Sequence, residues 1–173
     1  MHEPPETVEL GALIVQELQT RHDEKGEADM TTEARDLTTR NQLRGTVENV
    51  RTGSVMAEVE IDVRGEQFVA AVTKHSVERL RLAKGDEVTV LVKATEVMLA
   101  KGSGTYDELT TRNQIKGKVA SIETGSVMAE VRIEVAGGEL VAAVTRHSVE
   151  RLGLAEGDEV VALVKATEVM LAK

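Results

Sequence analysis

Cysteine is absent from this chain of 173 residues, and aromatic residues are scarce, with one Phe, one Tyr and no Trp. Without cysteine the chain can form no disulfide, thiolate metal site or cysteine nucleophile. The lack of aromatic rings argues against nucleic acid as a partner, because single-strand-binding barrels stack bases on such rings. Any inorganic ligand must therefore be held by oxygen and nitrogen groups.

Long apolar runs are also missing. The longest apolar stretch near the N-terminus is Ala12–Val15, whereas a membrane-spanning helix needs about 20 residues. The N-terminus starts with acidic residues and prolines, where a secretory signal carries a basic region. We therefore expect a cytoplasmic protein that has no membrane partner.

The usual catalytic signatures are absent from the sequence. There is no G-x-S-x-G, no P-loop and no G-x-G-x-x-G motif. Each repeat described below holds one histidine, and no second histidine stands at ligand spacing, so a directly bound metal cation is not expected. These absences predict that the protein is not an enzyme.

The net charge of −9 is unevenly distributed along the chain. Residues 1–36 hold ten acidic and three basic residues and sum to −7, so residues 37–173 contribute only −2. A summed negative field repels anions, but most of it belongs to the N-terminal segment. An anionic ligand elsewhere in the chain is therefore not excluded.

The sequence contains a duplication with a period of 72 residues. Residues 38–101 and 110–173 agree at 46 of 64 positions, and both copies end in LVKATEVMLAK. This divides the chain into an N-terminal extension (1–37), a first domain (38–101), a short Gly-Ser-Gly linker (102–109) and a second domain (110–173).

Each copy alternates apolar and polar residues with a period of two, as in Val55–Val63, Phe68–Val72 and Val88–Val92. This pattern is typical of half-buried strands, and Thr52-Gly53 and Arg64-Gly65 are expected turns. One helix is predicted over His75–Leu82. The fold class is thus mainly β, with two tandem small OB-like barrels that each carry one short helix. Such small domains bury little surface, so pairing or oligomerisation is expected.

Three groups of residues in each copy could hold an anion. The first is the block Thr38-Thr39-Arg40-Asn41-Gln42, which returns unchanged at residues 110–114. Its hydroxyls, amides and planar guanidinium suit an oxyanion. The alternative is a polar strand entry with a solvated arginine.

The second group lies where a strand passes into the predicted helix, at residues 72–77 and 144–149. Hydroxyls beside the first helical N–H groups could complete an anion pocket, although ordinary capping by Thr73 or Ser76 explains them equally. The third group is Lys93, with its counterpart Lys165, which either extends from the rim of the barrel or faces an anion.

These blocks, in this order and at this spacing, resemble the molbindin or Mop domain, twice over. That family opens with S/T-x-R-N-Q, carries G-x-V-x-A-E-V and V-T-x-x-S-V segments, and closes on V-K-A-x-x-V-M-L. The resemblance covers the chain except for the N-terminal extension and the linker. In this chain Thr38-Thr39 stands where many relatives have Ser-Ala, which keeps the first hydroxyl.

The resemblance implies an intracellular protein that binds and stores molybdate or tungstate at sites between domains, without an organic cofactor, and that assembles as a homotrimer. The oxyanion-binding residues that it implies are Thr38, Arg40, Ser76 and Lys93 in copy one and Thr110, Arg112, Ser148 and Lys165 in copy two. We also expect Thr73, Val77, Thr145 and Val149 as candidate neighbours that offer backbone contacts. His75 and His147 stand where the family varies and would be neighbours only of a site near a threefold axis.

The N-terminal extension has no counterpart in the repeat. Thr7–His22 is compatible with a helix whose Leu10, Ile14 and Leu18 share one face, followed by an acidic segment. Such a helix could pack on its own barrel. Alternatively, residues 1–22 could dock on a protein partner, which would make the chain a molybdate-dependent sensor or interaction module.

Overall fold

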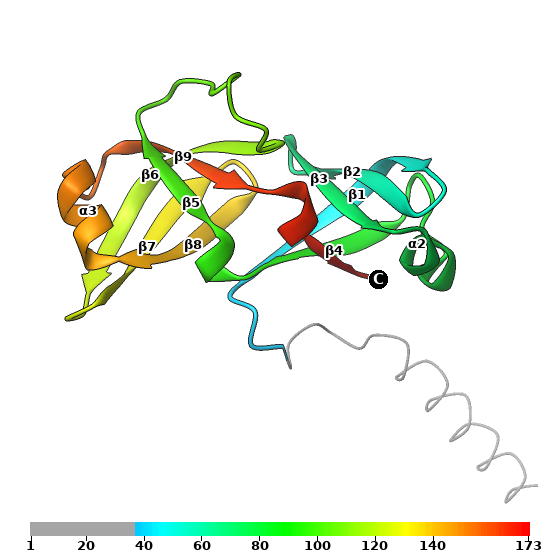
Figure 1. Cartoon of the computed structure of the whole chain (residues 1–173), viewed down its shortest axis with the longest axis horizontal. Coiled ribbons are helices and arrows are strands. Elements are labelled where there is room, and N and C mark those ends of the chain that lie inside the picture. The colour runs from blue at the N-terminus through cyan, green and yellow to red at the C-terminus, as the bar shows by residue number, and fades with distance from the viewer. Residues whose placement is uncertain (1–36) are drawn as a thin grey trace, which may run out of the picture. The chain divides into compact units, whose positions relative to one another are not determined.

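The computed structural model describes residues 37–173, and Thr38–Lys173 forms one compact unit (Figure 1). The predicted helix Thr7–His22 and the acidic segment after it lie outside the described residues. The described part is mainly β, with two five-stranded sheets and one short α-helix in each copy. The predicted fold class of tandem OB-like domains is therefore confirmed.

The two copies contain the same elements in the same order. Copy one consists of β1 (Asn41–Thr52), β2 (Met56–Val63), β3 (Glu66–Thr73), α2 (Lys74–Leu80), β4 (Glu87–Val92), the 3-10 turn η2 (Ala94–Glu96) and β5 (Met98–Lys101). Copy two consists of β6 (Asn113–Thr124), β7 (Met128–Val135), β8 (Gly138–Thr145), α3 (Arg146–Leu152), β9 (Glu159–Val164), η3 (Ala166–Glu168) and β10 (Met170–Ala172).

The predicted alternation of side chains is visible in β2, where every second residue from Ala57 to Val63 is buried. The strand begins at Met56, one residue later than predicted, and Val55 before it is 71% exposed. The N–H of Gly53 donates to the carbonyl of Met56, which closes the hairpin before the strand starts. The sequence-based start of this strand at Val55 was thus wrong.

The first strand of each copy is long enough to serve two neighbours. β1 pairs with β2 up to Thr52 and with β4 from Asn41 onward, and its register with β2 shifts between Val47 and Asn49. A Cβ on Gly45 would lie 2.6 Å from the carbonyl oxygen of Asp62. The glycine and the irregularity let the strand curve sharply, as a small barrel requires.

The α-helix of each copy is shorter than predicted. α2 spans Lys74–Leu80, whereas the sequence predicted 75–82, and Thr73 caps it by accepting from the N–H of Ser76. Arg81 takes a left-handed conformation, with φ of 49° and ψ of 47°, and the N–H of Leu82 turns back to the carbonyl of Val77. This C-terminal turn ends the helix two residues early.

The terminal strands are exchanged between the copies. β5 of copy one pairs with β9 of copy two, with Met98 opposite Leu163. Reciprocally, β10 of copy two pairs with β4 of copy one, with Met170 opposite Leu91. Figure 1 shows each exchanged strand beside its partner. The boundaries of the sequence repeat therefore do not coincide with those of the sheets.

A lysine follows or ends each exchanged strand and fastens it. Lys101 Nζ lies 2.7 Å from Asp158 Oδ2 and 2.6 Å from the carbonyl oxygen of Gly153. Lys173 Nζ makes the same two contacts with Asp86 Oδ2, at 2.6 Å, and with the carbonyl oxygen of Arg81, at 3.0 Å. We call these two pairs of contacts, one pair at each lysine, the lysine clamps. Each joins the end of one copy to the helix end of the other.

The linker is tied to copy two. The N–H of Tyr106 donates to Gln114 Oε1 at 2.8 Å, and Gln114 Nε2 donates to the carbonyl of Tyr106 at 3.0 Å. The linker 102–109 is thus fixed near its middle, two residues after the Gly-Ser-Gly start. Among residues 37–173, no helix is long and apolar enough to cross a membrane.

Candidate functional site

The repeated opening block, residues 38–42 and 110–114, places a buried asparagine in the contact between the copies. Asn41 and Asn113 are each 1% exposed. Asn113 Oδ1 accepts from the N–H of Val69 at 2.6 Å, and its Nδ2 donates to the carbonyl of Val69 at 2.9 Å. Asn41 makes the same pair of bonds with Val141, at the same distances.

Each asparagine side chain therefore bonds to both the backbone N–H and the backbone carbonyl of one residue on the edge strand of the opposite copy. The backbone of a neighbouring strand would make the same pair of hydrogen bonds. The sequence prediction passed over these residues and favoured the threonine and arginine beside them. An amide in a polar block gives no sequence signal of burial, so its role is seen only in its contact with the edge strand of the other copy.

The two predicted arginines cross to the opposite copy. Arg40 Nη2 lies 2.9 Å from Glu130 Oε1 on β7. Arg112 Nη1 and Nη2 lie 3.3 and 3.4 Å from the two carboxylate oxygens of Glu58 on β2. Both arginine side chains are about half exposed, at 50% and 54%. They are thus accessible to solvent but have carboxylate partners.

The predicted lysine stands beside the arginine of its own copy. Asn41 pairs with Val92 in the antiparallel register of β1 and β4, so Arg40 and Lys93 extend from neighbouring strand ends. Lys93 also precedes η2, which packs against β8 of copy two. Lys165 has the equivalent place before η3, which packs against β3 of copy one.

The predicted serine lies far from the arginine of its own copy. Arg40 precedes the first residue of β1, whereas β1 ends beside β2, whose first residue Met56 pairs with Thr73 at the entry to α2. Twelve residues at about 3.3 Å each separate these ends along β1. Ser76 and Arg40 therefore belong to different locations, although both lie in copy one, and the prediction of sites between domains remains open.

Each serine instead lies on the side of the other copy's arginine. Glu130, the partner of Arg40, pairs with Ala143 on β8. Two residues further along, Thr145 ends β8 and caps α3, where Ser148 lies. By the repeat, Glu58 pairs with Ala71, two residues before Thr73.

These relations define two equivalent locations, which we call the first and second seam. At the first seam Arg40 of copy one contacts Glu130 of copy two. Lys93 lies beside Arg40 in the sheet register and Thr38 lies two residues before it, and Thr145 and Ser148 follow the strand that pairs with Glu130. The second seam combines Thr110, Arg112 and Lys165 of copy two with Glu58, Thr73 and Ser76 of copy one.

The hydroxyl groups at each seam bond to one another. Thr73 Oγ1 lies 2.9 Å from Ser76 Oγ, and Thr145 Oγ1 lies 2.8 Å from Ser148 Oγ. Each threonine oxygen also accepts from the serine N–H at 3.2 Å. The alternative of ordinary helix capping is therefore the arrangement present here.

The remaining predicted neighbours differ in what they can offer. Val77 and Val149 are buried in the core, so only their backbone could face a ligand. His75 and His147 lie exposed in the first turn of α2 and α3. Within residues 37–173, no group of three or more His, Cys, Asp or Glu side chains could hold a metal ion.

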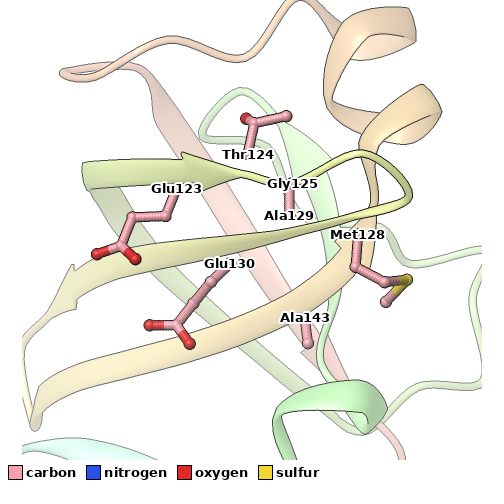
Figure 2. A pocket seen from close by; sticks show the side chains of 7 residues that line it. All are labelled: Glu123, Thr124, Gly125, Met128, Ala129, Glu130 and Ala143. Carbon is pink, nitrogen blue, oxygen red and sulfur yellow. The ribbon is translucent and has the colours of Figure 1, made fainter.

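An open hollow in copy two adjoins the first seam through Glu130, but no cationic residue lines it. It is lined by Glu123, Thr124, Gly125, Met128, Ala129, Glu130 and Ala143. Figure 2 shows the carboxylates of Glu123 and Glu130 side by side, and these residues are opposite each other in the register of β6 and β7. Two carboxylates repel an anion, so the hollow itself is not a candidate oxyanion site.

Two stretches of the chain, residues 37–99 and 109–171, match the family model described as the TOBE domain. The chain is 43% identical over 135 residues to the molybdenum transport protein ModE of Azotobacter vinelandii, covering 77% of this chain and 49% of that protein. It is 40% identical over 135 residues to the molybdenum-pterin-binding protein MopA of Rhodobacter capsulatus, covering 77% and 51%. The chain thus spans about half the length of these curated relatives.

A solved structure resembles nearly all of the described part. It is the cytoplasmic molybdate-binding protein ModG with molybdate bound, at a TM-score of 0.75 and 41% identity. The match covers 79% of this chain and 98% of that chain. The two-copy fold of residues 37–173 therefore matches almost the full length of this relative.

Proposed function

Because the chain belongs to the TOBE domain family, we propose that it binds the tetrahedral dianions molybdate and tungstate at its two seams and stores them without chemical change. Relatives named for molybdenum or molybdate, one of them with molybdate bound, support this ligand. The description of that relative as cytoplasmic supports the same location for this chain.

One observation carries the proposal. Each seam joins an arginine and a lysine from one copy to a strand end in the other copy that carries two hydroxyl groups. Guanidinium, ammonium and hydroxyl groups supply the N–H and O–H donors that an oxyanion needs. The proposed ligands are Thr38, Arg40, Lys93 and Ser148 at the first seam, and Thr110, Arg112, Lys165 and Ser76 at the second.

The charge of the described part is compatible with this ligand. Copy one sums to +1 and copy two to −1, while residues 1–36 hold −7 of the total of −9. Each copy is therefore close to neutral, and most of the negative charge that would repel an anion lies in residues 1–36. Selectivity over sulfate then rests on size, because a rigid set of donors spaced for the larger molybdate leaves the smaller anion with stretched hydrogen bonds.

We further propose that the chain assembles as a homotrimer. Val55, Met56, Val127 and Met128 are between 44% and 71% exposed, and they form an apolar tip at the β1–β2 and β6–β7 hairpins. Exposed apolar side chains at equivalent positions are typical of association surfaces. Light scattering at micromolar concentration should give three times the chain mass, and a stable monomer would refute the trimer.

Calorimetric titration tests the ligand and the site together. The intact protein should bind molybdate and tungstate more tightly than sulfate and phosphate. The Arg40→Ala/Arg112→Ala variant should bind at least tenfold more weakly, because it loses one charge-assisted donor group per seam. Arg79→Ala/Arg151→Ala is the matched control, since it removes the same charge from the last turns of α2 and α3. Equal losses in both variants would contradict the site.

A further inference from the structure

Two glutamates outside the predicted ligand set hold the arginines of the seams. Glu58 on β2 accepts from both terminal nitrogens of Arg112, and Glu130 on β7 accepts from Arg40. Each glutamate belongs to the copy opposite its arginine. Both carboxylates are 29% exposed, so they lie at the surface of the seam beside the arginines.

A carboxylate and a tetrahedral oxyanion bind a guanidinium in the same way. Both present oxygen atoms to the N–H groups at the edge of the planar fork. A dianion that approaches Arg40 therefore meets the negative charge of Glu130 in the place where its own oxygens would bind. The arginine must exchange one partner for the other.

Each glutamate also has a cation within its own copy. Glu130 Oε1 lies 3.1 Å from Arg132 Nη2, and Glu58 Oε1 lies 3.8 Å from Arg51 Nη1. These second partners can keep the carboxylate neutralised when the arginine of the other copy turns to a ligand. Arg51 also contacts Glu60 at 3.2 Å and Arg132 also contacts Glu139 at 3.4 Å, so each of these cations is shared between two carboxylates.

The two copies provide this second cation from different positions. Arg51 of β1 corresponds by the repeat to Glu123, and Arg132 of β7 corresponds to Glu60. A recent duplication would preserve identical residues, but here the cation has changed strand while its pairing with the glutamate is retained. The pairing, rather than either residue, is the feature common to both copies.

The ion pairs of Glu58 and Glu130 are not explained by their contribution to the stability of the fold. Ion pairs between half-exposed side chains contribute little to the free energy of unfolding, because water screens them and side-chain order costs entropy. The partners of Glu58 and Glu130 are 36% to 66% exposed. Their consistent placement on the ligand arginines therefore points to the ligand.

We propose that Glu58 and Glu130 are internal competitors of the oxyanion, and that they set the affinity of the seams by occupying Arg112 and Arg40. This inference rests on the proposed function. It gives the glutamate of the repeated A-E-V segment a role in ligand binding besides its place in strand β2 or β7. The glutamates act through the arginines and need not touch the anion.

The test compares anion binding by the full chain and by the Glu58→Gln/Glu130→Gln variant. Glutamine keeps the shape of the side chain but removes the charge that competes. Tungstate should bind roughly tenfold more tightly to the variant. Perrhenate, a tetrahedral anion with one charge instead of two, should gain only about threefold, because the repulsion that is removed scales with ligand charge.

Glu87→Gln/Glu159→Gln is the matched control. These residues are the exposed first residues of β4 and β9, and their substitution removes the same two charges away from the arginines. The control should gain much less than the seam variant, and the melting temperatures of all three proteins should agree within a few degrees.

The outcomes separate the two proposals. Failure of the unmodified chain to bind any of the oxyanions would overturn the proposed function itself. If the unmodified chain binds tungstate and the seam variant binds it equally, the glutamates do not compete. Weaker binding by the seam variant would show that they position the arginines, and this also overturns the inference.

Discussion

The two copies in this chain differ at 18 of their 64 aligned positions, yet the contacts that join them are reciprocal. Both asparagines bond to an edge strand of the other copy, both arginines reach a glutamate across a seam, and both terminal strands are exchanged. The differences fall mainly on turns and exposed strand faces. The residues that join the copies are thus the same in both copies, although other positions differ.

The asparagines allow the largest test of this comparison. Asn41→Ala and Asn113→Ala each leave a buried N–H and carbonyl on the opposite edge strand without a partner. Each substitution should lower the free energy of unfolding by about 2–3 kcal/mol. Because the four hydrogen bonds match in length between the copies, the two losses should be equal in urea unfolding.

Asn49→Ala provides the control for this prediction. Its amide contacts Glu60 at 3.2 Å in a partly buried position, so its loss should be no more than about 1 kcal/mol. A loss as large as those of the buried asparagines would show that burial is not the cause. Clearly unequal losses for Asn41 and Asn113 would break the reciprocity.

A helix end gives the second test, because the copies differ there. Arg81 ends α2 at φ 49°, whereas Gly153 ends α3 at φ 56°. A left-handed conformation is strained for arginine and not for glycine. Arg81→Gly should therefore stabilise the protein by about 0.5–1 kcal/mol, and Gly153→Arg should destabilise it by a similar amount.

Thermal unfolding of the two single variants and of the double variant measures this effect. The double variant, which exchanges the residues between the copies, should unfold close to the unmodified protein. If Arg81→Gly were destabilising instead, contacts of the arginine side chain would outweigh the backbone strain.

The lysine clamps give the smallest effect, and it depends on pH. The hydrogen bond from Lys173 holds the pKa of Asp86 below its ordinary value, with a further contribution from the N–H of Ala83. The hydrogen bond from Lys101 and the N–H of Ala155 lower the pKa of Asp158 in the same way. A pKa that is lower in the folded state stabilises the fold above the ordinary pKa of aspartate, and this contribution is lost as the pH falls through the folded value.

The melting temperature should therefore fall as the pH drops below the ordinary pKa of aspartate, about 4, partly because of these two groups. Lys101→Met/Lys173→Met should flatten that part of the pH profile, and each single variant should remove about half of the change. An unchanged profile in the double variant would show that other carboxylates cause the acid loss.

Much of the fold follows from the sequence, but the exchange of strands does not. The alternation in β2 and the turn at Arg64-Gly65 have local causes, so they could be predicted. Both copies end in the same residues, so the last strand fits either sheet equally well by sequence. In the structure η2 packs against β8 and η3 against β3, and these contacts between the copies cannot be read from the repeat pattern.

The site shows the same limit. The types of the candidate ligands could be predicted, because arginine, lysine and hydroxyl groups suit an oxyanion. Their grouping could not be predicted from order along the chain, since Arg40 and Ser76 stand near opposite ends of β1. Asn113 was passed over because a buried amide and an exposed one look alike in sequence.

The exchanged strands also impose an order on biosynthesis. The sheet of copy one is complete only when residues 170–172 have left the ribosome, because β10 supplies its last strand. Until then the edge of β4 is open, and the first half of the protein has a strand of matching sequence, Met98–Lys101, that belongs elsewhere. The sheet of copy one can therefore be completed only after copy two has been synthesised. The final pairing joins residues about 80 positions apart in the sequence.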